Sequence, residues 1–491
     1  MIKVMLIGHN YDYEVKELLK LFYEAEDIVI LHSENSLDFD IEEDHIISKI
    51  VTQESLIAVN TEVRINNNIT SLEKSSLVEG SPEEIKKVAK YLIKASIFEL
   101  LQKEKKKKLL WGFLTGIRPT KIVHELMEKG KQDQEIIRKL TEDYFIVKEK
   151  ALLLLEVAKI EHAYIYPINQ NKVSIYISIP FCPTRCIYCS FPSNPLDQFN
   201  KYVDDYIEAL CKEIRGTAEL LNKQKKYIET IYIGGGTPTT LNIEQFSKLF
   251  DEITLSFDLS NLKEFTVEAG RPDTIDREKL SFLKRNGVTR ISINPQTMND
   301  CTLKEIGRSH SVSQTVEAYQ LAREVGFDNI NMDIIIGLPG ENLQMLRNTM
   351  EEIMKLAPSN LTVHTLAIKN ASKLKEQQRQ QSQENPEIIK MLGMTEGYAR
   401  QMGLRPYYMY RQKHMVGNLE NIGYAKAGFE CIYNIQIMEE KQTIIAVGAG
   451  AVSKVVFPKE NRLERVPNIK NLEQYIERVD EMITRKKKQL I

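Results

Sequence analysis

The stretch KVSIYISIPFCPTRCIYCSF, residues 172–191, joins an apolar run of strand length to three closely spaced cysteines. Its run VSIYISI is rich in the β-branched and aromatic residues that favour a buried strand. Amphipathic helical segments, such as residues 203–221, separate it from five further runs. These runs are YIETIYI (227–233), EFTVE (264–268), RISIN (290–294), NINMDIII (329–336) and LTVHTL (361–366). Alternating strands and helices predict a parallel sheet buried on both faces, so we expect an α/β fold with a partial (β/α)6 TIM-like barrel.

The chain is also long enough, at 491 residues, to form more than one domain. We expect an added N-terminal α/β domain of unknown role over 1–165, the barrel over 166–380, and a substrate-covering C-terminal α+β extension over 381–491. In the first domain, IKVMLIG (2–8) predicts a strand, and SPEEIKK (81–87) predicts the start of a helical region. The acidic region between them is expected to be poor in strands.

Composition and charge limit the class of protein. The formal net charge is only -2, with no coherent basic face, so we expect no nucleic-acid partner. No run of 18 apolar residues is present, and the apolar run at the start is too short for a secretory signal. Six cysteines in so long a chain do not suggest a disulfide framework. We therefore expect a cytoplasmic protein without a membrane span; its oligomeric state stays open.

Cys182, Cys186 and Cys189 have C-x3-C-x2-C spacing, which suits a metal centre. Thiolates are soft ligands for zinc and for iron–sulfur clusters. A structural zinc ion takes four protein ligands, and no histidine lies within this cysteine motif, so zinc would need a distant fourth ligand. A disulfide would leave one thiol over. A 4Fe–4S cluster held by three cysteines, with one iron open to a small molecule, accounts better for the uneven number of ligands.

Polar or glycine-rich residues follow the other predicted strands as well. GGGTP (234–238) follows the second strand and lacks the Gly-Lys-Ser/Thr ending of a P-loop, so we interpret it as a place where a ligand approaches the backbone closely. The remaining predicted strands hold or lead to Glu268, Gln296, Asp333 and Ala367. Because the carboxyl ends of parallel strands meet at one edge, we expect one shared active site there.

The cysteine motif, with an aromatic residue before its last cysteine and GGGTP after it, resembles the radical S-adenosylmethionine (SAM) superfamily. Within it, YISIPFC (176–182), NPQ (294–296), IGR (306–308) and NMDIIIGLPG (331–340) resemble the oxygen-independent coproporphyrinogen III oxidase group over roughly residues 170–455. LTGIRPTK (114–121) and PYYMYRQKH (406–414) are most similar to its long subgroup, called coproporphyrinogen dehydrogenase in Gram-positive bacteria.

The resemblance implies a 4Fe–4S cluster on the three cysteines and one SAM molecule bound to it, and leaves open a second SAM. At the cluster-bound SAM it implies contacts from Tyr176, Gly235, Gly236, Thr237 and Glu268. At the second SAM site it implies contacts from Tyr188, Gln296, Arg308, Asp333 and Ala367. The cofactors, and not the side chains, would supply the difficult chemistry.

The reaction that the resemblance implies is the oxidative decarboxylation of coproporphyrinogen III to protoporphyrinogen IX in heme biosynthesis, with an external electron donor and acceptor. A tetrapyrrole that carries propionates needs cations around it, and we expect these from Arg405, Arg411, Lys413 and His414. Phe191, however, stands where the oxidases have a fourth cysteine, and heme chaperones of the family also have an aromatic residue there. A heme-binding trafficking protein and another radical SAM enzyme acting on a tetrapyrrole are therefore the alternatives.

Overall fold

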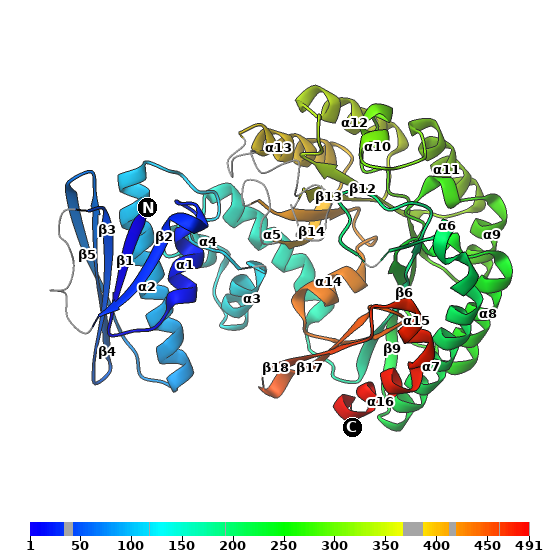
Figure 1. Ribbon diagram of the computed structural model, residues 1–491, viewed down its shortest axis with the longest axis horizontal. Coiled ribbons are helices and arrows are strands. Elements are labelled where there is room, and N and C mark those ends of the chain that lie inside the picture. Colours follow the sequence, from blue (N-terminus) through cyan, green and yellow to red (C-terminus); the bar gives the residue numbers. More distant parts are fainter. Residues whose placement is uncertain are drawn as a thin grey trace. The chain divides into compact units, whose positions relative to one another are not determined.

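The computed structural model describes residues 1–33, 43–116, 118–191, 193–366, 386–411, 419–460 and 462–490. The chain forms two compact units, Met1–Leu155 and Glu156–Ile491, and each is considered by itself (Figure 1). Among the described residues, no helix combines the length and the apolar character that crossing a membrane would require.

The first unit contains a five-stranded mixed sheet in the order β2-β1-β3-β4-β5. Its strands are β1 (Ile2–Ile7), β2 (Ile28–Ser33), β3 (His45–Gln53), β4 (Leu56–Ile65) and β5 (Asn68–Leu77). Its helices are α1 (Asp12–Leu19), α2 (Pro82–Lys105), α3 (Thr120–Glu128) and α4 (Asp133–Glu142), and α5 (Lys148–Ile165) leads into the second unit. The strand and the helix start predicted at residues 2–8 and 81–87 are confirmed, the latter as a capping box between Ser81 and Glu84.

The expectation of few strands between residues 8 and 81 is wrong, because β3, β4 and β5 form a continuous antiparallel meander there. In β4 buried and exposed positions alternate, so the strand buries only one face of the sheet. Half of its residues are therefore polar or exposed. The strand contains no continuous apolar run and is for that reason not evident in the sequence.

The second unit is built on a sheet of eleven strands. The six predicted strands are confirmed, and each pairs in parallel with the next along the chain. They are β6 (Lys172–Ile179), β9 (Tyr227–Gly235), β10 (Glu264–Glu268), β11 (Arg290–Ser292), β12 (Asn329–Ile336) and β13 (Asn360–Thr365). Apolar side chains such as Ile175, Ile177 and Ile231 are fully buried, and each contributes about 1.5–3 kcal/mol to folding.

Helices cover the outer face of this sheet (Figure 1). They are α7 (Val203–Lys223), α8 (Ile243–Ser256), α9 (Arg277–Arg285), α10 (Asp300–Glu305), α11 (Val312–Val325) and α12 (Leu343–Leu356). The start of α8 is closed by a capping box between Asn242 and Gln245, and α11 has a second box between Ser311 and Gln314. These caps satisfy the free amides of the first turns, so the helices begin where the loops from the strands end.

The C-terminal part of the chain extends the same sheet at both edges. Its strands are β14 (Arg405–Tyr410), β15 (Asn421–Ala425), β16 (Thr443–Val447), β17 (Val452–Phe457) and β18 (Arg462–Pro467). Its helices are α13 (Pro386–Gln401), α14 (Ile432–Glu439), α15 (Leu472–Glu477) and α16 (Val479–Leu490). β15 is antiparallel to β13 at one edge, whereas β16 is parallel to β6 at the other. The mixed α/β class is thus confirmed, with a sheet larger than the six strands predicted.

Candidate functional site

The three cysteines of the motif lie in one loop directly after β6. Cys182 ends the short strand β7 (Phe181–Cys182), and the Cys189 amide donates to the Cys186 carbonyl at 3.2 Å. Burial and the neighbouring Cys186 and Cys182 sulfurs raise the pKa of the Cys189 thiol above its ordinary value. Three soft donors that repel one another as thiolates are a ligand set that an iron–sulfur cluster would stabilise. The residues therefore fit such a cluster.

The glycine run at the end of β9 is bound to this cysteine loop. The Gly236 and Thr237 amides donate to the Ile179 and Phe181 carbonyls at 2.8 and 2.7 Å. A Cβ at Gly236 would lie 2.4 Å from the Phe181 oxygen and 3.0 Å from the Cys182 sulfur, so the close approach requires glycine. The Thr237 hydroxyl donates to that sulfur at 3.6 Å. The predicted glycine loop is thus hydrogen-bonded to the segment that carries the predicted cysteine ligands.

Glu268, at the end of β10, lies in an aromatic surrounding. The Tyr232 hydroxyl donates to it, and the rings of Tyr176 and Tyr433 stack with Tyr232 at centroid distances of 6.1 and 4.4 Å. Burial, together with the charge of Asp333, raises the pKa of Glu268 to about 7, although the hydroxyl of Tyr232 and the Gly235 amide oppose the rise. A half-buried carboxyl at a strand exit, close to the glycine loop, can accept hydrogen bonds from an ammonium or hydroxyl group of a ligand.

Gln296, which follows β11, lies beside Asp333 in the middle of β12. The Gln296 amide donates to the Asp333 carbonyl at 2.9 Å, and Gln296 has a positive φ of 68°. Burial raises the pKa of Asp333, but hydrogen bonds from His364, Asn331 and Thr362 outweigh it, so the net shift is downward. Asp333 is therefore an ionised acceptor at neutral pH.

Buried polar atoms without hydrogen bonds gather at this edge of the sheet. Within the described part of the chain, Asn294 Oδ1, Gln296 Oε1 and Arg308 Nε have no hydrogen-bond partner. Arg308 is otherwise held through its Nη1, which donates to the carbonyls of Asn294 and Gly270 at 2.5 and 3.3 Å. Because unsatisfied buried polar atoms are costly, a polar ligand or a water molecule at this edge can stabilise them by hydrogen bonds.

Other predicted site residues lie nearby, apart from the rest, or outside the described residues. Tyr188 packs against an apolar cluster around Leu303 and Ile335 and adjoins Arg308. Arg411 follows β14 at the same edge as His364, which contacts Tyr410. Arg405 begins β14 and pairs with Ala425 of β15. Ala425 in turn pairs with Asn360, at the start of β13. The structure therefore places Arg405 at the opposite edge, because six residues of strand separate its two ends. Ala367, Lys413 and His414 are outside the described residues.

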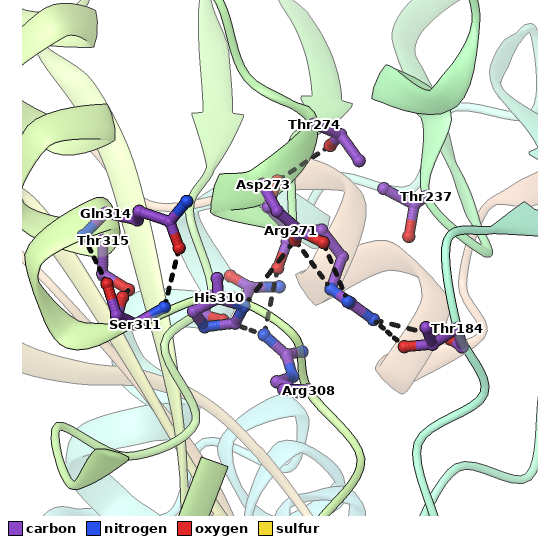
Figure 2. A network of polar contacts seen from close by, with 12 residues as sticks. Thr184, Thr237, Arg271, Asp273, Thr274, Arg308, His310, Ser311, Gln314 and Thr315 are labelled. Atoms are coloured by element: carbon purple, nitrogen blue, oxygen red, sulfur yellow. Dashed lines mark hydrogen bonds and ion pairs between the residues drawn. The ribbon is translucent and has the colours of Figure 1, made fainter. Parts of the chain in front are cut away.

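Four polar residues around the cysteine loop were missed by the sequence analysis: Thr184, Arg271, Asp273 and His310. Figure 2 shows Arg271 between Asp273 on one side and Thr184 on the other. A signal was present, since Arg271 follows the third strand exit by three residues. The prediction for this strand exit named only Glu268, the last residue of the strand.

Comparisons with known proteins place the chain in a family. Residues 176–353 match the family model of the radical SAM superfamily. Over 384 residues the chain is 43% identical to the oxygen-independent coproporphyrinogen-III oxidase-like protein HemZ of Bacillus subtilis (strain 168), and the match covers 77% of each protein. It is 34% identical to the heme chaperone HemW of the same organism, with 57% of this chain and 70% of that one covered.

A solved structure shows a similar fold. It is the coproporphyrinogen III oxidase HemN from Escherichia coli, a radical SAM enzyme, with a TM-score of 0.52 and 24% sequence identity. The likeness covers 66% of this chain and 73% of that one.

Proposed function

Because the chain belongs to the radical SAM superfamily, and within it to the oxygen-independent coproporphyrinogen III oxidase-like proteins, we propose that it oxidatively decarboxylates coproporphyrinogen III to protoporphyrinogen IX. The observation that carries the proposal is the 43% identity to the oxidase-like protein HemZ, which extends over 77% of both chains. The parallel sheet with its outer helices is the partial barrel of this superfamily.

In this proposal Cys182, Cys186 and Cys189 hold a 4Fe–4S cluster, and SAM binds beside it. When bound, the cluster supplies the electron that cleaves a C–S bond of SAM and so yields a radical. The protein contributes position and charge. Gly235 and Gly236 lie against the backbone of Ile179, Gly236 also approaches Cys182, and the Thr237 hydroxyl donates to the Cys182 sulfur. Glu268 provides a half-buried acceptor at the adjoining strand exit.

The polar atoms at the next strand exits give a second part of the site. The oxygens of Asn294 and Gln296 can accept hydrogen bonds and Arg308 Nε can donate one, while Asp333 is ionised. This mixture suits the amino-acid and ribose groups of SAM better than it suits an apolar ring. We therefore assign Gln296, Arg308 and Asp333 to a SAM contact. Tyr188, which belongs to the cysteine loop, adjoins Arg308, so this contact lies next to that loop.

Of the cations expected to bind the substrate's propionates, we assign one to this role among the described residues. Arg411 lies at the carboxyl end of β14, and although burial lowers its pKa to about 10, it stays charged at neutral pH. A guanidinium there can bind a propionate of the tetrapyrrole. Arg405 is not part of this contact, because it lies at the other end of the strand. An external donor and an external acceptor complete the electron transfer, and we place the reaction in the cytoplasm.

A second function, heme binding by a trafficking protein, is favoured by one residue. Phe191 occupies the position of the fourth cysteine that the resemblance to the oxidases implies, and 61% of its surface is exposed beside the cysteine loop. The 34% identity to the heme chaperone HemW supports the same alternative. In that case the cluster and SAM site would be kept while the substrate site would hold heme.

An anaerobic assay separates the two functions. The protein is reconstituted with iron and sulfide, given dithionite, SAM and coproporphyrinogen III, and deoxyadenosine and tetrapyrrole masses are followed together. Loss of two carboxyl groups alongside deoxyadenosine formation supports the oxidase. Deoxyadenosine without decarboxylation, together with stoichiometric heme binding in a titration, would favour the chaperone instead.

A further inference from the structure

Arg271 is a buried cation whose position depends on one carboxylate. It follows β10 and directly precedes a short 3-10 turn, Pro272–Thr274, and only 3% of its surface is exposed. Its Nε and Nη2 donate to the two carboxylate oxygens of Asp273, both at 3.0 Å (Figure 2). This two-point contact fixes the plane of the guanidinium and directs its remaining nitrogen away from Asp273.

That remaining nitrogen, Nη1, points into the cysteine loop. It donates to the Thr184 hydroxyl at 3.1 Å and lies 3.9 Å from the Cys186 sulfur. The Thr184 hydroxyl in turn donates to the Gly307 carbonyl at 2.9 Å. Arg271 thus contacts both Thr184, which is bound to the Gly307 carbonyl, and Cys186, the middle cysteine of the motif.

The carboxylate that holds Arg271 also faces a buried imidazole, and the turn that carries it is bound to neighbouring residues. The His310 Nδ1 lies 3.7 Å from Asp273 Oδ1, and the imidazole is completely buried. The Thr274 hydroxyl donates to the Arg271 carbonyl at 2.8 Å and bonds the Thr239 hydroxyl at 2.6 Å. The turn is therefore anchored to the loop after β9, and the guanidinium has little freedom to move away from Cys186.

We propose that Arg271, oriented by Asp273, is a positioning residue for the iron–sulfur cluster that holds the cysteine loop and raises the cluster's reduction potential. Hydrogen bonds and positive charge near a ligating sulfur stabilise the reduced form, which carries one more negative charge. Solvent screens buried charges only weakly, and the cationic end of the Arg271–Asp273 pair lies nearer the sulfur than the carboxylate does, so the pair favours the reduced form. The proposal rests on the cluster of the proposed function and is independent of its substrate.

The test measures cluster potential and iron content in the absence of SAM and substrate. Full-length Arg271→Gln, Arg271→Lys and Asp273→Asn variants are reconstituted, and their midpoint potentials are obtained from titrations monitored by electron paramagnetic resonance. Arg271→Gln removes the cation and leaves Asp273 unbalanced, so we expect the ratio of reduced to oxidised cluster at fixed potential to fall about tenfold, or about 59 mV. Asp273→Asn keeps an acceptor for Nε and removes the negative charge, so the potential should rise. Arg271→Lys keeps the positive charge but loses the two-point contact with Asp273 that positions it. Its potential should therefore stay nearer that of the wild type, while its iron content falls.

The control is Arg277→Gln, since Arg277 lies on the neighbouring α9 with 61% of its side chain exposed, paired with Glu324. Its potential should equal that of the wild type. The proposal is overturned if the Arg271→Gln and Asp273→Asn potentials both match this control, or if both shift in the same direction. If Arg271→Gln does not load iron, the direction of the Asp273→Asn shift alone decides. Absence of decarboxylation would change none of these results, because no substrate enters the measurement.

Discussion

The hydroxyl of Tyr232 donates a hydrogen bond to Oε1 of Glu268 at 2.5 Å, across two adjacent strands at their carboxyl ends. This contact joins the aromatic interior of the sheet to a half-buried carboxyl at the edge where the cysteine and glycine loops meet. The position of Glu268 is therefore set by packing beneath it and not by solvent.

The first prediction concerns pH and Glu268→Gln in protein without cofactors. The folded-state pKa of Glu268, about 7, is above its ordinary 4.5. Protonated Glu268 therefore contributes stability that is complete below pH 4.5 and is lost as the pH rises through 7. Glutamine stays neutral and keeps an acceptor for Tyr232, so at pH 8 the variant should be more stable than the wild type by about 1–3 kcal/mol.

Urea unfolding of both proteins between pH 5 and pH 8 measures this difference. The difference in unfolding free energy should grow with pH. Parallel curves for the two proteins over the whole range would contradict the raised pKa.

The second prediction concerns the cysteine ligands. Replacement of Cys182, Cys186 and Cys189 by serine should abolish the brown iron–sulfur absorbance after reconstitution, because serine is a hard, poorly ionised ligand. Cys301→Ser is the matched control, since Cys301 is exposed and lies outside the motif. An unchanged spectrum in the triple variant would exclude this ligand set.

The third prediction concerns the closest backbone approach in the site. Gly236→Ala places a methyl group 2.4 Å from the Phe181 carbonyl oxygen, so the loop must shift away from Cys182. We expect SAM affinity, measured by equilibrium dialysis on reconstituted protein, to fall at least tenfold, about 1.4 kcal/mol.

Gly393→Ala provides the comparison for this variant. Gly393 lies within α13, and a Cβ there meets nothing within 4 Å. Alanine in a helix interior should be neutral or stabilising by up to about 1 kcal/mol. Equal SAM affinities of the two variants would show that the glycine loop is not close to the ligand.

The fourth prediction concerns a buried ion pair that closes the C-terminal end of the second unit. Lys486 and Glu213 expose 1% and 0% of their side chains, and Glu213 also accepts from Gly448, Asn468 and Tyr475 at 2.8, 2.7 and 2.6 Å. Lys486→Met leaves the carboxylate buried without its counter-charge, which should cost about 3–5 kcal/mol. Chemical denaturation measures the loss, with the exposed Lys487→Met as control; equal stabilities would mean that the pair contributes nothing.

Local patterns in the sequence were sufficient for the centre of the fold. The run EFTVE at 264–268 is β10 without any change of bounds, and its first four residues are buried, as expected of a central strand between two layers. The strands over 45–77 were not predicted. A strand with one polar face has apolar residues only at alternate positions, so it contains no continuous apolar run. We expected residues 381–491 to form a substrate-covering extension. Two of its strands, β15 and β16, pair with β13 and β6, and no local pattern contains that choice of partner.

By itself, the sequence determined which residues are candidates for the chemistry, since the spacing of Cys182, Cys186 and Cys189 and the glycine run at the end of β9 are set by covalent neighbours. It also determined which strand exits carry polar groups, because parallel strands joined by helices have one possible carboxyl edge. Only the tertiary structure decided that Arg271 reaches Cys186, 85 residues away, and that Arg405 lies at the edge opposite to Arg411. Contacts of that kind depend on the register of strands and the direction of a buried side chain, which are properties of the packed sheet and not of any short stretch of chain.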